Sequence, residues 1–222
     1  SGGGRAGRVL PKVARRLRDG VGDAELHIVI STSYEQARDL TRSAALTAVP
    51  GDVVAVMGGD GMAHLGLNAC AGTDATLAVI PAGTGNDFAR GAGVPGSVKE
   101  AVEALVRGET RVMDLSLLTN AAGSRYVGAV VSSGYDARVN RATNDIRLRF
   151  GPLSYGYIAL RELAHFSPLT YRLVIDGVPR EVEAMMVAVC NTGVFGGGMQ
   201  ISPDADAADG LLDVTIIHKA SR

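Results

Sequence analysis

Two glycine-rich turns contain the residues of this 222-residue chain that are best suited to chemistry. The first turn has Gly58, Gly59, Asp60 and Gly61 after the apolar residues 53–57, and the second has Gly83, Thr84, Gly85 and Asn86 after residues 76–80. A glycine turn between a strand and a helix presents backbone N–H groups and the positive end of the helix dipole to an anion. Two such turns in close succession indicate a phosphate-binding site.

Carboxylates accompany both turns. Asp60 would repel a phosphate unless it holds a metal or a ligand hydroxyl, and its turn matches neither G-x-G-x-x-G nor the Walker A pattern. Asp87 is expected to cap the helix that carries Arg90, and Arg90 to pair with Asp87 or reach a phosphate. The structural alternatives are a tight turn with a capping aspartate and an ordinary surface ion pair three residues apart.

The elements that must position these turns alternate between strand and helix. Amphipathic helices are predicted from about residue 8 to 18, over 34–49, after Gly61 and over 97–107, the last capped by Ser97 and Glu100 and closed by Gly108. Apolar strands are predicted at 26–30, 53–57 and 76–80. Such alternation requires crossover connections and predicts an open parallel sheet with helices on its faces.

After Asp114 the pattern changes to strands with few helices between them. Strand-like runs occur at 115–118, 126–132, 171–175, 182–189 and 211–217, one helical insertion is predicted at 155–166, and Asp176 and Gly177 form a hairpin turn. We therefore predict an α/β domain over residues 1–114 and a mainly antiparallel β domain over 115–222.

Composition narrows the class of protein. The net charge of −1 gives no electrostatic case for nucleic acid, and Cys70 and Cys190 suit neither a disulfide framework nor a zinc site. No apolar run reaches the roughly 18 residues needed to cross a bilayer, and no signal-peptide region is visible. A cytoplasmic protein that meets membranes peripherally is expected. An arginine-rich stretch would face anionic lipid or form a solvated helix face: Arg138, Arg141, Arg147 and Arg149.

The two turns and one later segment together resemble the bacterial diacylglycerol kinase family of soluble lipid kinases. The matching segments are residues 58–61, residues 81–90 and the acidic stretch from Pro203 to Val214, which contains the letters DGLLDV. The resemblance covers essentially the whole chain. It implies an N-terminal open parallel α/β nucleotide-binding domain, a mainly antiparallel β-sandwich domain and ATP-dependent phosphoryl transfer to a lipid hydroxyl, with diacylglycerol as the favoured acceptor.

Site roles follow from the resemblance residue by residue. Both glycine turns, with Arg5 from the tail of a further nucleotide loop, would line ATP, and Asp60 would lie near the phosphates and Mg²⁺. Asp87, Arg90 and Asp114 would form a charged network around the cleft, completing a catalytic set with Asp60. The Asp209 side chain, with main-chain carbonyls of Asp206 and Leu211, would bind a structural Mg²⁺, although a solvated acidic turn is the plain alternative. His64 and His165 are expected to be structural.

Some features depart from the family pattern. Met62 stands where the family usually has threonine, and we interpret it as a tolerated variant. The chain begins where the family's first strand and Asn-Pro loop end, and it stops before the family's Asp-Gly-Glu segment, which is expected to supply the general base. Two alternatives stay open: a phosphotransferase for a soluble acceptor, like NAD kinases and phosphofructokinases, and a non-catalytic nucleotide- or lipid-binding relative. The partner is expected to be lipid at a membrane surface, and whether the protein forms a homodimer is left open.

Overall fold

A computed structural model describes residues 4–134 and 167–219, and these residues belong to two compact units. Unit 1 consists of Ser1–Ala129 and Asn191–Leu211, and unit 2 of Val130–Cys190 and Leu212–Arg222. The predicted helix at 155–166, His165 and the four arginines between 138 and 149 lie outside the described residues. None of the helices in the described part of the chain is long and apolar enough to cross a membrane.

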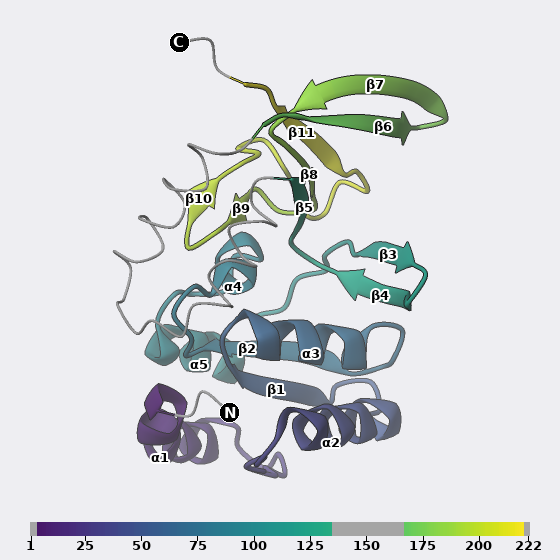
Figure 1. The fold of residues 1–222 in the computed structure, drawn as a ribbon. Coiled ribbons are helices and arrows are strands. Elements are labelled where there is room, and N and C mark those ends of the chain that lie inside the picture. Colours follow the sequence, from purple (N-terminus) through teal and green to yellow (C-terminus); the bar gives the residue numbers. More distant parts are fainter. Residues whose placement is uncertain (1–3, 135–166, 220–222) are drawn as a thin grey trace. The chain divides into compact units, whose positions relative to one another are not determined.

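Unit 1 begins with helices and strands that alternate as predicted over residues 53–91 (Figure 1). Its elements are α1 (Gly4–Gly20), α2 (Tyr34–Thr47), β1 (Val53–Gly58), α3 (Asp60–Cys70), β2 (Thr76–Pro81), α4 (Asp87–Gly91) and α5 (Val98–Val106). Strands β1 and β2 pair in parallel, with Val53 opposite Thr76 and Gly58 opposite Pro81. Ser97 caps α5, and its side chain accepts the Glu100 N–H, as the capping box predicts.

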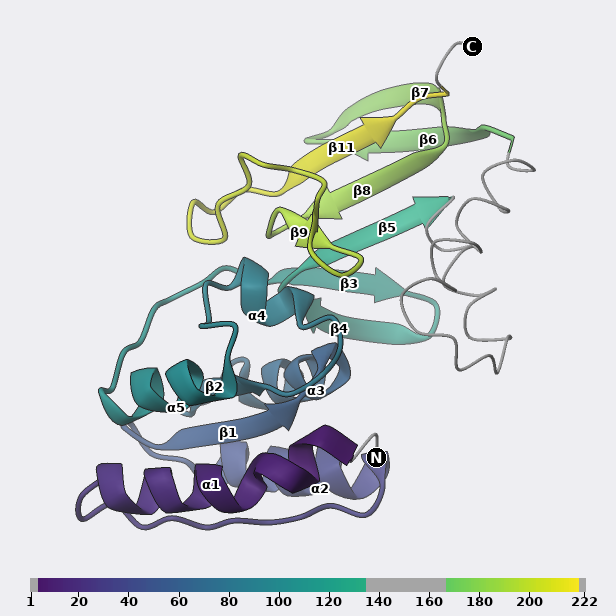
Figure 2. The ribbon, with the colours of Figure 1, turned by 90° about the vertical axis from the view of Figure 1, so that its left-hand side faces the viewer.

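Helices cover both faces of this two-stranded sheet (Figure 2). Val56 and Val79 on one face pack with buried residues of α3 and α4, among them Leu67 and Phe88. On the other face, Ile80 packs with buried residues of α1 and α5: Val13, Leu17 and Val102. The parallel α/β arrangement is confirmed, and it brings the carboxyl ends of both strands, where the glycine turns begin, to one edge.

The strand predicted at residues 26–30 is wrong. This segment has no regular secondary structure, and none of the described strands pairs with it. Val29 is 65% exposed and Ile30 is 71% exposed, which is more than a strand inside a covered sheet would show. An apolar run makes a strand only where a neighbour accepts its backbone hydrogen bonds, and periodicity alone does not reveal that neighbour.

Two short hairpins complete unit 1. Strands β3 (Ser116–Asn120) and β4 (Gly123–Val127) pair with each other, as do β9 (Val194–Phe195) and β10 (Met199–Gln200). The Asn68 side chain of α3 joins β4 as a neighbouring strand would, because its amide oxygen accepts the Tyr126 N–H and its amide nitrogen donates to the Tyr126 carbonyl, both at 2.9 Å.

Unit 2 is antiparallel, as predicted. Strand β8 (Met186–Cys190) lies between β5 (Val130–Gly134) and β11 (Asp213–Ile217), while β6 (Leu169–Ile175) and β7 (Val178–Ala184) form a hairpin. Asp176 and Gly177 turn this hairpin with φ of 50° and 78°, the left-handed values that a two-residue turn requires. The runs at 126–132 and 182–189 each divide into two strands, because residues 128–129 and Met185 interrupt the ladders.

The compact units do not follow the predicted boundary near Asp114. Unit 1 extends to Ala129 and includes the returning segment Asn191–Leu211, because that segment packs on α4 and on the residues after α5. Division of the chain into functional domains at residue 114 stays a prediction.

Candidate active site

The first and second glycine turns touch each other. A Cβ built on Gly83 would lie 2.3 Å from the Gly59 Cα, and one built on Gly59 would lie 3.2 Å from the Gly83 Cα. The Ala82 N–H also donates to the Gly58 carbonyl at 2.8 Å, which continues the β1–β2 ladder into the turns. Glycine is required at Gly83, because a Cβ there would overlap the backbone of Gly59, whereas a Cβ on Gly59 would make a tight contact with Gly83.

Asn86 fixes the shape of the second turn. Its amide oxygen accepts the Gly83 N–H and its amide nitrogen donates to the Gly83 carbonyl, each at 3.0 Å. Its own φ is 58°, a left-handed conformation that asparagine tolerates better than most residues. Asn86 therefore shapes the turn from within, and the exposed Thr84 is left at the tip.

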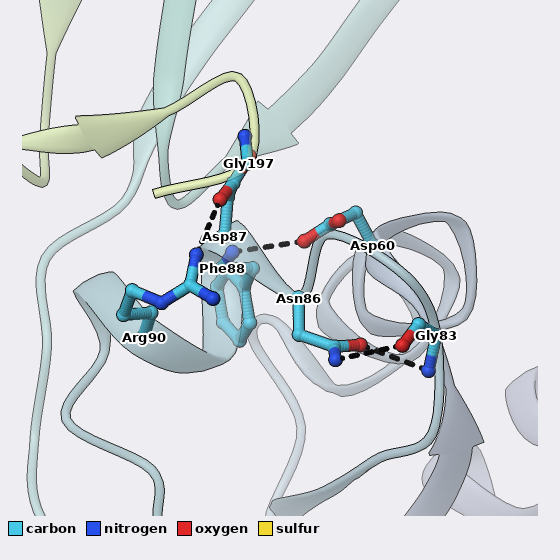
Figure 3. Close-up of polar contacts among 7 residues, drawn as sticks. All are labelled: Asp60, Gly83, Asn86, Asp87, Phe88, Arg90 and Gly197. Carbon is cyan, nitrogen blue, oxygen red and sulfur yellow. Dashed lines mark hydrogen bonds and ion pairs between the residues drawn. The ribbon is translucent and has the colours of Figure 1, made fainter. Parts of the chain in front are cut away.

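Asp60 joins the first turn to the helix that follows the second. Its Oδ1 accepts the Phe88 N–H at 2.9 Å, so an aspartate 28 residues earlier in the chain caps α4 (Figure 3). A Cβ on Gly85 would lie 2.9 Å from the other oxygen, Asp60 Oδ2. The capping role expected for Asp87 is wrong, since Asn86 is the N-cap residue and Asp87 is the first residue of α4.

The Asp87 side chain instead accepts hydrogen bonds from two partners. Its Oδ1 accepts a hydrogen bond from Arg90 Nη1 at 2.9 Å, and its Oδ2 accepts the Gly197 N–H at 2.7 Å (Figure 3). Gly197 is the centre of a third glycine turn, residues 196–198, between β9 and β10. The pairing of Asp87 with Arg90 is therefore present, and it is extended by a segment 110 residues away.

Asp114 lies against a different part of unit 1. Its Oδ2 accepts the Gly210 N–H and its own N–H donates to the Ala207 carbonyl, both at 2.7 Å. The Asn191 side chain donates to its carbonyl. Within the described residues Asp114 makes no hydrogen bond or ion pair with Asp87 or Arg90, so the predicted network divides into an Asp87–Arg90 part and an Asp114 part.

The aspartates of the acidic turn, residues 204–213, include two that accept hydrogen bonds from backbone N–H groups within the turn. Asp206 Oδ1 accepts the Ala208 N–H at 3.1 Å, and Asp209 Oδ1 accepts the Leu211 N–H at 2.9 Å. Among the residues that the structure describes, no three acidic, histidine or cysteine side chains gather as metal ligands. A cation at Asp209 would therefore need main-chain carbonyls and water as its other ligands.

The remaining predicted residues have simple surroundings. Arg5 lies in α1, and its side chain is not among those described. Met62 packs against the core cluster of α3 and α4 and lies close to Gly58. His64 is half-buried on α3, and burial, with a smaller contribution from the Arg125 charge, holds its pKa below the usual 6.5. A half-buried histidine on a helix fits the structural role expected for it.

Three residues of the returning segment were missed as site residues. The backbone N–H of Gly197 binds Asp87, and the residues Asn191 and Thr192 are each 1% exposed. A Cβ on Gly91 would lie 2.5 Å from Thr192 Oγ1, so this segment also contacts the end of α4. The run of three glycines was a visible signal, but nothing in the sequence indicates which carboxylate its backbone would meet.

Known protein families match both parts of the chain. Residues 1–118 match the family model of the diacylglycerol kinase catalytic domain, and residues 129–222 match that of the YegS C-terminal NAD kinase beta sandwich-like domain. A diacylglycerol kinase from Mycobacterium tuberculosis is 39% identical over 213 residues, covering 95% of this chain and 67% of that protein. A protein named "Probable lipid kinase YegS-like" from Stenotrophomonas maltophilia is 32% identical over 217 residues, covering 90% and 68%.

A solved structure extends the likeness to the fold. The crystal structure of a diacylglycerol kinase from Bacillus anthracis str. Sterne matches 98% of this chain and 70% of its own, with a TM-score of 0.75 and 25% identity. The chain spans about two thirds of the length of these relatives. Since a catalytic-domain model matches more than half of the chain and the relatives match nearly all of it, the chain belongs to the diacylglycerol kinase family of lipid kinases.

Proposed function

We propose that this protein transfers the γ-phosphate of ATP to the hydroxyl of diacylglycerol, or of a similar neutral lipid, and so produces phosphatidic acid. The observation that carries the proposal is the contact of two glycine turns at one edge of a parallel sheet, with a carboxylate between them. Backbone amides at such an edge suit the phosphates of a nucleotide.

The first and second glycine turns are proposed to bind the triphosphate, with Arg5 as a further contact. Gly59 is the N-cap of α3 and, among the described residues, no side chain accepts the N–H groups of Asp60 and Gly61, so these first amides of α3 are open to an anion. Phosphoryl transfer depends mainly on positioning and on neutralising charge, which backbone amides and a bound cation both supply.

Asp60 is proposed to hold Mg²⁺ at the phosphates. Its Oδ1 is occupied by the Phe88 N–H, while Oδ2 accepts no hydrogen bond from the described residues and faces Gly85. Mg²⁺ commonly binds through one or two carboxylates together with substrate phosphates and water. A single free carboxylate oxygen beside the turns fits that requirement, and bound Mg²⁺ would neutralise charge on the transferred phosphoryl group.

A second Mg²⁺ is proposed at Asp209, with the carbonyls of Asp206 and Leu211. Its part would be structural, because these residues precede β11 and belong to the acidic turn. Peripheral contact with a membrane is proposed with the same function, since a diacylglycerol acceptor is embedded in lipid.

The test is phosphorylation of defined acceptors. Protein is incubated with γ-labelled ATP, Mg²⁺ and mixed micelles that contain diacylglycerol, and labelled phosphatidic acid is expected. Parallel reactions contain other neutral lipids, NAD, or no acceptor. Label in NAD would support the soluble-acceptor alternative, which the NAD kinase-like sandwich match makes worth testing. Nucleotide binding without label in any product would support the non-catalytic alternative.

A further inference from the structure

The two carboxylates beside the second glycine turn differ in how many of their oxygens are occupied. Asp87 uses both, one for Arg90 and one for the Gly197 N–H. Asp60 uses one, for the Phe88 N–H. An oxygen that already accepts a short hydrogen bond has one lone pair fewer for a metal or a phosphate-bound water, and its orientation is fixed by the donor.

We infer that the third glycine turn forms part of the wall of the active site, and that Asp87 and Arg90 are positioning residues that hold it there. Asp60 then has the direct contact with the phosphates and their metal. The inference rests on the proposed function for the chemistry, but the attachment of the turn to Asp87 is independent of turnover.

The position of the third turn supports this assignment. A Cβ on Gly85 would lie 2.9 Å from Asp60 Oδ2 and 3.7 Å from Asp87 Oδ2, so both carboxylates border the second turn. Asp87 Oδ2, the oxygen near Gly85, also accepts the Gly197 N–H. Asp87 Oδ2 therefore lies between the second turn and the third, and a single hydrogen bond connects it to the third.

Arg90 lies close to the same turn. A Cβ on Gly198 would lie 2.9 Å from Arg90 Nη1, so a larger residue there would have to displace the end of the Arg90 side chain. All three residues of the turn have left-handed φ values, of 62°, 87° and 104°. A backbone in this conformation costs little for glycine and is strained for other residues. The turn therefore has a conformation that suits glycine, and its Gly197 N–H binds the Asp87–Arg90 pair.

The negative charge of Asp87 is paired with the positive charge of Arg90. The Asp87 side chain is 18% exposed and the Arg90 side chain 49% exposed. Asp87 accepts one bond from a cation and one from an amide, so its charge is neutralised by the protein itself. A carboxylate in this state orients a loop well and attracts Mg²⁺ less strongly than an unpaired one.

Asp87→Asn tests the inference, because its one amide oxygen cannot replace both Asp87 oxygens, and any bond that it keeps to the Gly197 N–H loses the strength given by the negative charge. Hydrogen exchange of the Gly197 amide is expected to accelerate by about 10- to 100-fold, as for loss of one charge-assisted hydrogen bond. In the kinase assay KM is expected to rise by about tenfold with a smaller change in kcat. Asp60→Asn should show the opposite pattern, with lower kcat and unchanged exchange at Gly197.

Two further variants make the result decisive. Arg90→Lys keeps the charge and loses the planar fork, so it should give an intermediate acceleration of exchange, and it serves if Asp87→Asn does not fold. Asp74→Asn removes an exposed carboxylate from the loop before β2 and should change neither exchange nor KM. Unchanged exchange at Gly197 in Asp87→Asn, or a fall in kcat alone, would overturn the inference. If the wild-type protein phosphorylates no lipid, the exchange measurements still decide whether Asp87 holds the turn.

Discussion

In both the glycine turns and the acidic turn, aspartate side chains accept hydrogen bonds from backbone N–H groups. The separation along the chain between the aspartate and its donor differs greatly between the two regions. Asp60 accepts an N–H 28 residues away and Asp87 one 110 residues away. Asp206 and Asp209 accept amides only two residues ahead. Long-range bonds fix turns from separate elements against one another, whereas local bonds shape a single loop and leave it able to respond to a ligand.

Asp114 is the exception that connects the acidic turn to the rest of unit 1. Its carboxylate accepts the Gly210 N–H, and its backbone N–H binds the Ala207 carbonyl. The acidic turn is therefore attached to Asp114 near its middle. The comparison teaches that carboxylates of similar appearance in the sequence have different functions according to where their amide partners come from.

The largest effect is expected for Asp60→Asn. Asparagine keeps an oxygen that caps α4 through the Phe88 N–H, but it removes the negative charge proposed to hold Mg²⁺. We expect kcat to fall by about 10²–10³-fold, the range for loss of one electrostatic contact to a transition state, with little change in Tm. Kinase assays and thermal melts of the same preparation measure both, with Asp74→Asn as control. An unchanged kcat would show that Asp60 serves only to cap α4.

Gly83→Ala should disturb the glycine turns next most strongly. The added Cβ would lie 2.3 Å from the Gly59 Cα, so one of the two backbones must move. We expect a loss of about 1–3 kcal/mol in the free energy of unfolding together with weaker ATP binding. Chemical denaturation and nucleotide titration measure the two effects.

Gly61→Ala is a matched control for unfolding, because a Cβ there has nothing within 4 Å. It should not lower the free energy of unfolding. Equal stability of Gly83→Ala and Gly61→Ala would contradict the close contact between the turns.

Asp209→Ala tests the local character of the acidic turn. If a cation binds there with a Kd of about 10⁻³ M, 10 mM Mg²⁺ stabilises the wild-type protein by roughly 1.4 kcal/mol. The variant should lose this stabilisation and keep its ATP affinity, since the glycine turns are untouched. Thermal melts in Mg²⁺ and in chelator measure the difference. A wild-type Tm that is the same in both would rule out a structural cation at this turn.

The smallest effect concerns His64, on the helix behind the first glycine turn. Because its pKa is lowered in the folded protein, the unfolded chain binds the proton more readily, and stability falls as the pH drops below about 6.5. Partial exposure keeps this contribution to stability small. His64→Gln should flatten the dependence of Tm on pH between 5 and 7. A wild-type Tm that rises on acidification over this range would show that the sign is wrong.

Much of this architecture can be read from the sequence, because local signals agree with the fold. The β1 and β2 runs, the glycine turns after them and the capping box at Ser97 are all encoded within a few residues. The failure at residues 26–30 has a physical cause: strand formation depends on a neighbour that no local pattern describes.

Site contacts were harder to predict than elements. Asp60 and Asp87 could be chosen from their turns, but the Phe88 and Gly197 amides that bind them could not, because those pairings depend on tertiary packing. The same holds for Asp114, which the resemblance groups with Asp87 and Arg90 and which the structure joins to Gly210. Sequence motifs identify chemical groups, while backbone partners decide which of their atoms stay available.

The two cysteines allow transient local unfolding to be measured in the unmodified chain. Cys70 ends α3 in unit 1 and Cys190 ends β8 in unit 2; both are buried as free thiols, and burial raises the pKa of each. A protonated, covered thiol reacts with alkylating reagents only when its element unfolds transiently. Alkylation followed by peptide mass analysis would therefore time the opening of each unit separately, without any engineered label.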